Sequence, residues 1–125
     1  MLFDTDVLIF VQRGNMKAAK IIEDTIERNI SVLTYMELLQ CAKNKQHHKY
    51  TIDFLKTFDF KILPMTENIG HRASIYVEEY SLSHNVRSGD AIIAASAVEY
   101  GLTLYTANGK HFNPIKELDL KIFKP

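Results

Sequence analysis

An acidic pair interrupts the apolar residues at the start of the chain, and this pair restricts the possible folds more than any other feature. Leu2 and Phe3 are followed by Asp4-Thr5-Asp6, and the apolar run Val7–Val11 begins at the next residue. A carboxylate between two buried segments is costly unless it has a partner or a function. We therefore expect residues 1–4 to form a central strand, with Asp4 at its carboxyl end as the start of a metal-binding carboxylate cluster.

Short apolar segments alternate with helical patterns along the rest of the chain. The patterns predict strands at residues 1–4, 30–33, 60–63, 102–105 and 121–123, and helices at residues 6–13, 16–29, 34–45, 47–58, 67–84 and 88–100. Strands that alternate with helices are typical of a mainly parallel sheet whose two faces are covered. We therefore expect an α/β fold in a single domain of residues 1–125.

Polar residues mark the expected starts of these helices. Thr66 precedes one helical pattern, and Thr34 with Glu37 fits a capping box, in which a Thr caps the helix and a Glu lies three residues later. The helix expected at residues 16–29 has an apolar face that includes Ile26. These signals predict where each helix begins and which face it buries.

Charge and cysteine content limit the classes of protein that the chain can belong to. The 15 Lys and Arg residues balance the 15 Asp and Glu residues, so a polyanion would need a local patch or a metal ion to bind. The single Cys41 excludes an internal disulfide and is expected to be a small core residue. No signal-peptide pattern or membrane-length apolar run is present, so we expect a cytoplasmic protein.

Acids and amides from four segments fall at the carboxyl ends of the predicted strands. Asp4 follows the first strand, and Glu37 lies four residues after the second, in the first turn of its helix. Asp90 lies in the first turn of the helix at 88–100, while Thr106 and Asn108 follow the fourth strand. Because the carboxyl ends of parallel strands share one edge of the sheet, we expect these residues to form one site.

A cluster of carboxylates at this edge favours a divalent cation. Neighbouring carboxylates repel one another unless helix amino ends or a cation stabilise their charge. Oxygen ligands suit Mg²⁺ or Mn²⁺ better than zinc, and the waters that Mg²⁺ retains leave room for a phosphate and an attacking water. Each acid also has a structural alternative: Asp4 or Asp6 as a helix cap, Glu37 as part of a capping box, and Asp90 as a complement to a helix dipole.

Four segments of the chain carry a resemblance to a known family. They are LFDTDVLI at 2–9, SVLTYMELL at 31–39, SGDAIIAASAVEYGL at 88–102 and LYTANGKHF at 104–112. With these segments in this order, the chain resembles the PIN-domain ribonucleases, and among them the VapC-type toxins of toxin–antitoxin pairs. The resemblance implies a three-layer α/β/α sandwich and an endoribonuclease activity on RNA that depends on Mg²⁺ or, in its place, Mn²⁺.

The resemblance also implies roles for the acids. Asp4 and Asp90 would be the main metal ligands, and Glu37 would bind through water or direct the nucleophile. Asn108 would hold the family's fourth position, which is often Asp, and its neutrality leaves the number of metal ions open. This departure motivates an alternative, a catalytically impaired PIN-like module that binds RNA or protein. Asp6 would restore part of the missing charge, and Thr106 would orient its neighbours.

The implied partners are a second copy of the chain and a cognate antitoxin. In related pairs the antitoxin's tail lies in an apolar groove beside the acids and sends a basic side chain into them. The expected groove wall is the pair of helices within 6–29, together with Tyr35, Leu38 and Leu39. Both partners are expectations from the resemblance and not from the residues themselves.

Several basic residues are candidates for binding RNA phosphates. Arg13, Arg87 and Lys110 lie in or next to the motif segments. A separate basic cluster could also bind phosphates, although a solvated connection between helices is the favoured explanation; its members are Lys43, Lys45, His47, His48 and Lys49. His111 lies near the proposed site and is expected to be a surface loop residue.

Overall fold

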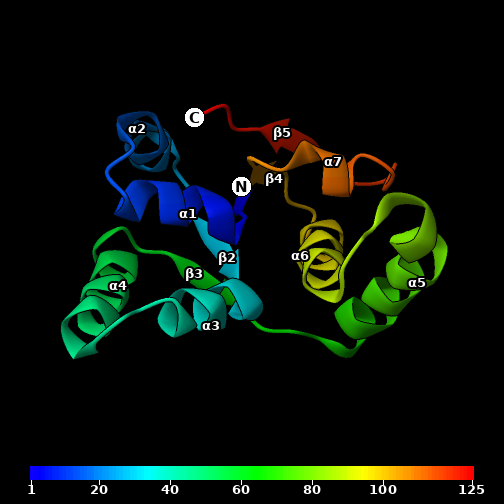
Figure 1. Cartoon of the computed structure of the whole chain (residues 1–125), viewed down its shortest axis with the longest axis horizontal. Coiled ribbons are helices and arrows are strands. Elements are labelled where there is room, and N and C mark those ends of the chain that lie inside the picture. The colour runs from blue at the N-terminus through cyan, green and yellow to red at the C-terminus, as the bar shows by residue number, and fades with distance from the viewer.

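Five short strands form one parallel sheet in the order β3-β2-β1-β4-β5 (Figure 1). The computed structural model describes residues 1–125, and its strands are β1 Leu2–Phe3, β2 Asn29–Ser31, β3 Lys61–Leu63, β4 Leu104–Thr106 and β5 Leu120–Ile122. Each neighbouring pair is parallel, as predicted, and β1 is the central strand. The carboxyl ends of β1 and β4 therefore meet at one edge of the sheet.

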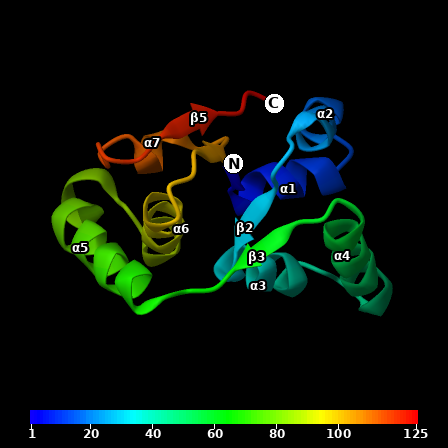
Figure 2. The ribbon, with the colours of Figure 1, turned by 180° about the vertical axis from the view of Figure 1, so that it is seen from behind.

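Seven helices surround this sheet (Figure 1). They are α1 Thr5–Gln12, α2 Met16–Asp24, α3 Val32–Gln40, α4 Lys45–Thr57, α5 Glu67–His84, α6 Ser88–Glu99 and α7 Gly109–Phe112. The ribbon seen from behind shows α5 and α6 together on one side of the strands and α1 to α4 on the other (Figure 2). None of the helices is both long and apolar enough to span a membrane.

Successive residues of the central strands enter two different cores. Leu2 and Leu104 pack with α5 and α6, whereas Phe3 and Tyr105 pack with α1, α2 and α3 on the other face. This alternation is the two-residue period of a β-strand, and it leaves β1 fully buried on both faces. The three-layer α/β/α sandwich is therefore confirmed.

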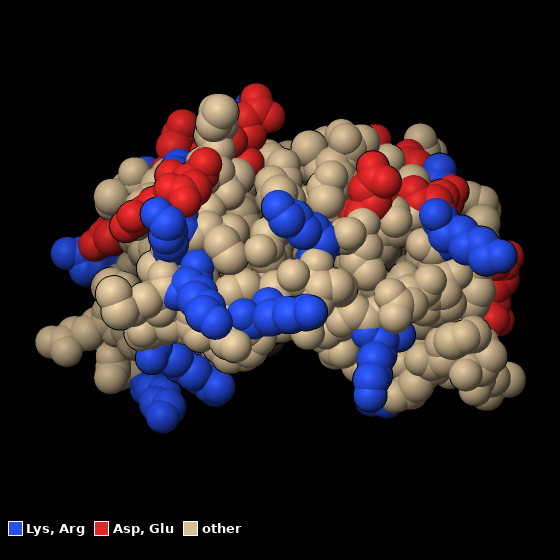
Figure 3. Space-filling model, turned by 90° about the horizontal axis from the view of Figure 1, so that it is seen from above, with Lys and Arg blue, Asp and Glu red and all other residues tan.

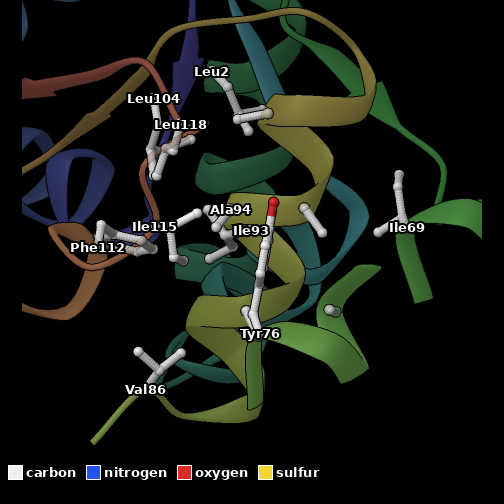
Figure 4. Packing of buried hydrophobic residues seen from close by; sticks show 14 residues of the cluster. Leu2, Ile69, Tyr76, Val86, Ile93, Ala94, Leu104, Phe112, Ile115 and Leu118 are labelled. Atoms are coloured by element: carbon white, nitrogen blue, oxygen red, sulfur yellow. The ribbon is translucent and has the colours of Figure 1, made fainter. Parts of the chain in front are cut away.

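Helix α6 owes its position against the sheet to its small side chains. Ala91, Ala94, Ala95 and Ala97 are fully buried, and Tyr76 of α5 lies along the helix (Figure 4). Small residues let the helix axis approach its neighbours closely, so α6 is covered on several sides. This packing fixes the amino end of α6, where Asp90 lies.

Helix α2 is shorter than the predicted helix at 16–29, because an arginine side chain caps its carboxyl end. The helix ends at Asp24, and the Arg28 guanidinium donates to the backbone carbonyls of Ile22 and Glu23. These carbonyls would otherwise accept bonds from the next helical turn. The predicted burial of Ile26 is wrong, since its side chain is 95% exposed.

Helix α3 begins earlier than predicted. Ser31 caps it by accepting the Thr34 backbone N–H, so Thr34 lies inside the first turn and the capping box with Glu37 does not form. Glu37 consequently lies in the second turn of the helix, free to face the pocket described below. Cys41, expected in the core, is exposed at the carboxyl end of α3.

Candidate functional site

A pocket of about 420 Å³ collects polar side chains from four separate segments at the carboxyl edge of β1 and β4. The lining side chains come from the β1–α1 junction, α3, the start of α6 and the start of α7; they are Asp4, Thr5, Asp6, Ile9, Glu37, Arg87, Gly89, Asp90, Ile93, Asn108 and His111. The sequence prediction that Asp4, Glu37 and Asp90 share one pocket is confirmed.

Asp4 is both a helix cap and a buried member of the pocket. Its Oδ1 accepts the Thr5 backbone N–H at 2.8 Å as the N-cap of α1, and its Oδ2 accepts the Thr106 hydroxyl at 2.7 Å. Burial, and then the nearby charge of Asp6, raise the pKa of Asp4 from 3.8 to about 7 despite these two hydrogen bonds. Without a cation, Asp4 is therefore partly protonated at neutral pH.

Asp6 has one carboxylate oxygen that no other group satisfies. Its Oδ2 accepts the Ala107 backbone N–H at 3.1 Å, whereas its Oδ1 is buried and has no hydrogen-bond partner. Burial raises the pKa of Asp6 above its ordinary value. A buried carboxylate oxygen without a donor is rare in folded proteins, and this one is open to a cation or a donor from outside the chain.

A chain of hydroxyl groups positions Glu37. The Thr5 hydroxyl donates to Glu37 Oε1 at 2.7 Å, and the Thr34 hydroxyl lies 2.9 Å from the Thr5 oxygen. Ser31 continues the chain, with its hydroxyl 3.3 Å from Thr34. Sequence reasoning missed Thr5 as a site residue, although its place between two acids was a signal.

Asp90, the fourth acid of the pocket, is in contact with a histidine. Asp90 Oδ2 lies 3.1 Å from His111 Nδ1, and the Asn108 side-chain nitrogen lies 3.1 Å from the same ring nitrogen. The expectation that His111 is an ordinary surface loop residue is therefore wrong, because α7 carries it into the pocket wall. Asn108 lines the pocket but hydrogen-bonds to His111, not to any of the acids.

Only one of the basic candidates for binding RNA phosphates lines the acid pocket. Arg87 lines the pocket, whereas Arg13, at the end of α1, and Lys110, on α7, do not. The basic cluster lies at the α3–α4 connection, where a separate hollow of about 460 Å³ is lined by Lys43, Lys45, His48 and Lys49 among others. Arg87 is thus the only Lys or Arg that lines the acid pocket.

The acids line one pocket, but their side chains do not converge on a point where a metal ion could lie. No three His, Cys, Asp or Glu side chains converge closely enough in this conformation to hold a metal ion. Their chemistry nevertheless fits a hard cation, because carboxylate oxygens dominate the lining and Asp6 Oδ1 is unsatisfied. Burial above all raises the pKa of Asp4 and Asp6, so a positive charge bound beside them would stabilise their ionised form.

Comparisons with known proteins identify the family. The family model for the PIN domain matches residues 1–118. Ribonuclease VapC10 of Mycobacterium tuberculosis (strain H37Rv) is 31% identical over 122 residues, which cover 94% of this chain and 90% of that protein.

Solved structures agree with this assignment. A toxin–antitoxin complex from Klebsiella pneumoniae contains a chain that is 31% identical, with a TM-score of 0.79 and coverage of 94% of this chain and 93% of that one. A chain of VapBC2 from Rickettsia felis, bound to a promoter DNA fragment, has the same TM-score at 17% identity and covers 98% of each chain, which shows the fold alone. This chain therefore belongs to the PIN-domain family and is of the VapC type.

Proposed function

We propose that this chain is a metal-dependent endoribonuclease that acts as a toxin and is neutralised by a cognate antitoxin. The observation that carries the proposal is the pocket in which the carboxylates of Asp4, Asp6, Glu37 and Asp90 gather with too few positive charges from the chain. The similarity to a protein named as a ribonuclease supports RNA as the substrate.

The acids would hold Mg²⁺ or Mn²⁺, with Asp4 and Asp90 as the main ligands and Asp6 close by. A divalent cation bound there would polarise the phosphodiester and make a bound water more acidic. Glu37, oriented by Thr5, would accept the proton of the attacking water. Ile9 and Ile93 form the apolar part of the wall.

Positive charge on the surface would then guide the RNA. Arg87 at the pocket would bind a phosphate oxygen next to the scissile bond. In the view from the side of α2, β5 and α7, Lys and Arg side chains lie across the middle and the lower part of the face, and most Asp and Glu side chains lie in the upper part (Figure 3). Although the net charge is zero, this face therefore presents basic side chains that a polyanion could contact.

The same pocket supports the proposal that an antitoxin binds this chain. A basic side chain from a partner would pair with the uncompensated acids and displace the cation. Of the predicted groove residues, Tyr35 lines an apolar hollow of about 230 Å³ with Leu55 and Phe60, whereas Leu38 is buried in the core and does not form a groove wall. Met16, 84% exposed on α2, offers further apolar surface for a partner. The homodimer rests on the resemblance alone.

Cleavage of RNA by the purified chain tests this proposal. We expect cleavage of single-stranded RNA with Mg²⁺ or Mn²⁺, none with a chelator, and a loss of at least about a hundredfold in Asp90→Asn. The matched control is Asp53→Asn, which removes an exposed Asp from α4 outside the pocket and should leave the rate unchanged. If the wild type binds RNA but never cuts it with either ion, the chain is instead a binding module.

A further inference from the structure

His111 occupies a place in the pocket that the proposed mechanism does not use. It lies on α7, which contacts α6 (Figure 1), and its ring approaches Asp90 at the start of that helix. Gly109, the first residue of α7, lies next to Ile122 on β5, and a Cβ on this glycine would lie 2.6 Å from Ile122 Cδ1. Helix α7 thus packs against both α6 and β5 and places the imidazole beside an acid.

The separation between His111 and Asp90 matches that of two ligands on one metal ion. His111 Nδ1 and Asp90 Oδ2 are 3.1 Å apart. Two neighbouring ligands of an octahedral ion, each about 2.1 Å from it, are about 3.0 Å apart. Neither atom would need to move far for both to bind the same cation.

Asn108 and Asp90 approach the same ring nitrogen of His111. The Asn108 side-chain nitrogen lies 3.1 Å from His111 Nδ1, and Asp90 Oδ2 lies 3.1 Å from that same atom. The tautomer of the ring decides which of these atoms carries the proton. A cation bound by Nδ1 and Asp90 Oδ2 would take the place of a proton held between them.

We propose that His111 Nδ1 is a ligand of the divalent cation and gives the site a preference for Mn²⁺ over Mg²⁺. The inference rests on the metal site of the proposed function and adds a nitrogen donor to it. Mn²⁺ accepts imidazole more readily than Mg²⁺, which binds oxygen almost exclusively. His111, not Asn108, would then be the ligand beside Asp90.

Metal titration without RNA tests the proposal on the full chain. Calorimetry at one fixed pH would measure the affinity for Mn²⁺ and for Mg²⁺ in the wild type and in His111→Ala. We expect His111→Ala to weaken Mn²⁺ binding about tenfold and to change Mg²⁺ binding much less. His71→Ala is the matched control, because His71 is exposed on α5 outside the pocket and its loss should change neither affinity.

Pulsed electron paramagnetic resonance of the Mn²⁺-loaded protein gives a direct second readout. The wild type should show modulation from a coordinated nitrogen, and His111→Ala should lose it while His71→Ala keeps it. Because the His111 side chain is 34% exposed, its removal should leave the fold intact, which thermal unfolding would verify.

The possible results separate this inference from the proposed function. Tighter binding of both ions in His111→Ala would mean that His111 competes with the cation for Asp90, and would overturn the inference. Unchanged binding with no nitrogen signal in the wild type would overturn it as well, while leaving the carboxylate site standing. If the wild type binds neither ion, the proposed function itself fails.

Discussion

Two groups of carboxylates in this chain have opposite electrostatic surroundings. On the outer surface of α5 and α6, the Arg72 guanidinium lies 2.6 Å from Glu99 and 2.7 Å from Glu117. The Tyr76 hydroxyl also donates to Glu117, and these hydrogen bonds lower the pKa of Glu117. This arginine cluster neutralises its own acids and ties α5, α6 and the segment before β5 together.

In the acid pocket the carboxylates have neutral donors but too little positive charge. Asp4 is held by a hydroxyl and a backbone N–H, and one oxygen of Asp6 has no donor. Burial raises the pKa of both groups, the reverse of the shift at Glu117. The comparison shows that this chain can pair its acids when they serve the structure. The acids that the chain leaves without a positive partner are the basis for the cation site that we propose.

The comparison predicts that removing an acid from the pocket harms activity and not stability. Asp4→Asn should lower RNA cleavage by at least about a hundredfold, because it removes a proposed ligand. The same change should keep or raise the free energy of unfolding of the metal-free protein at pH 8, because it removes a buried charge. Cleavage rates and urea denaturation would measure the two effects, and a marked loss of stability would contradict this distinction.

The two groups should respond to pH in opposite directions. Since the pKa of Asp4 is higher in the folded chain than in the unfolded chain, the folded state holds an extra proton between about pH 4 and pH 7. The Tm of the metal-free protein should therefore fall as the pH rises from about 4 to about 7, and it should level off above about 7. The lowered pKa of Glu117 acts the other way, so its contribution is present above the ordinary range of Glu and is lost as the pH falls below it.

Two variants identify which acid causes each part of the dependence of Tm on pH. Asp4→Asn should flatten the fall in Tm above about pH 5, and Glu117→Gln should flatten the fall at acid pH. Differential scanning calorimetry in the presence of a chelator would measure both profiles. A profile that neither variant changes would remove the electrostatic basis of the comparison.

Loss of the arginine cluster should cost stability and leave activity intact. Arg72→Met keeps much of the apolar stem but leaves Glu99 and Glu117 without their cation, so we expect a loss of about 1 kcal/mol in the free energy of unfolding. This modest size reflects the partial exposure of all three side chains. The rate of RNA cleavage per folded molecule should not change, and a large drop in that rate would mean that the cluster also serves the pocket.

The smallest effect is expected from the removal of Arg87, the basic side chain that lines the pocket. Arg87→Ala should raise the KM for RNA several-fold and make it less dependent on salt, because a phosphate contact is lost. Arg13→Ala is the control, since Arg13 is exposed at the end of α1 outside the pocket. Equal effects of the two substitutions in steady-state cleavage would show that Arg87 acts only through general surface charge.

The sequence could predict the parallel sheet and the shared pocket because both follow from local patterns. Alternating strand and helix patterns specify a parallel sheet, and the carboxyl ends of such strands meet at one edge. Asp4, Glu37 and Asp90 could therefore be brought together without coordinates. The spacing of their side chains could not, because it depends on hydrogen bonds such as that between Thr5 and Glu37.

The errors have equally local causes. Ser31 and Thr34 are both suitable helix caps, and only the backbone conformation decides that Ser31 is the one. His111 was misplaced because the four residues of α7 are too few to show a helical pattern. Ile26 fits the apolar face of a longer helix, but Arg28 satisfies the carbonyls that end α2. In each case the sequence pattern allowed two local structures and did not decide between them.

Calorimetric titration of the metal-free protein with Mn²⁺ tests most directly whether the pocket's unpaired acids receive an external cation. Near pH 6.5 the wild type should bind Mn²⁺ and release part of a proton, because binding drives off the proton that Asp4 retains at its pKa of about 7. Repeating the titration in buffers with different ionisation enthalpies measures that proton. Arg72→Met should behave as the wild type, whereas Asp4→Asn should lose most of the binding and the proton release. Binding that is absent from the wild type, or equal in Asp4→Asn, would contradict the account.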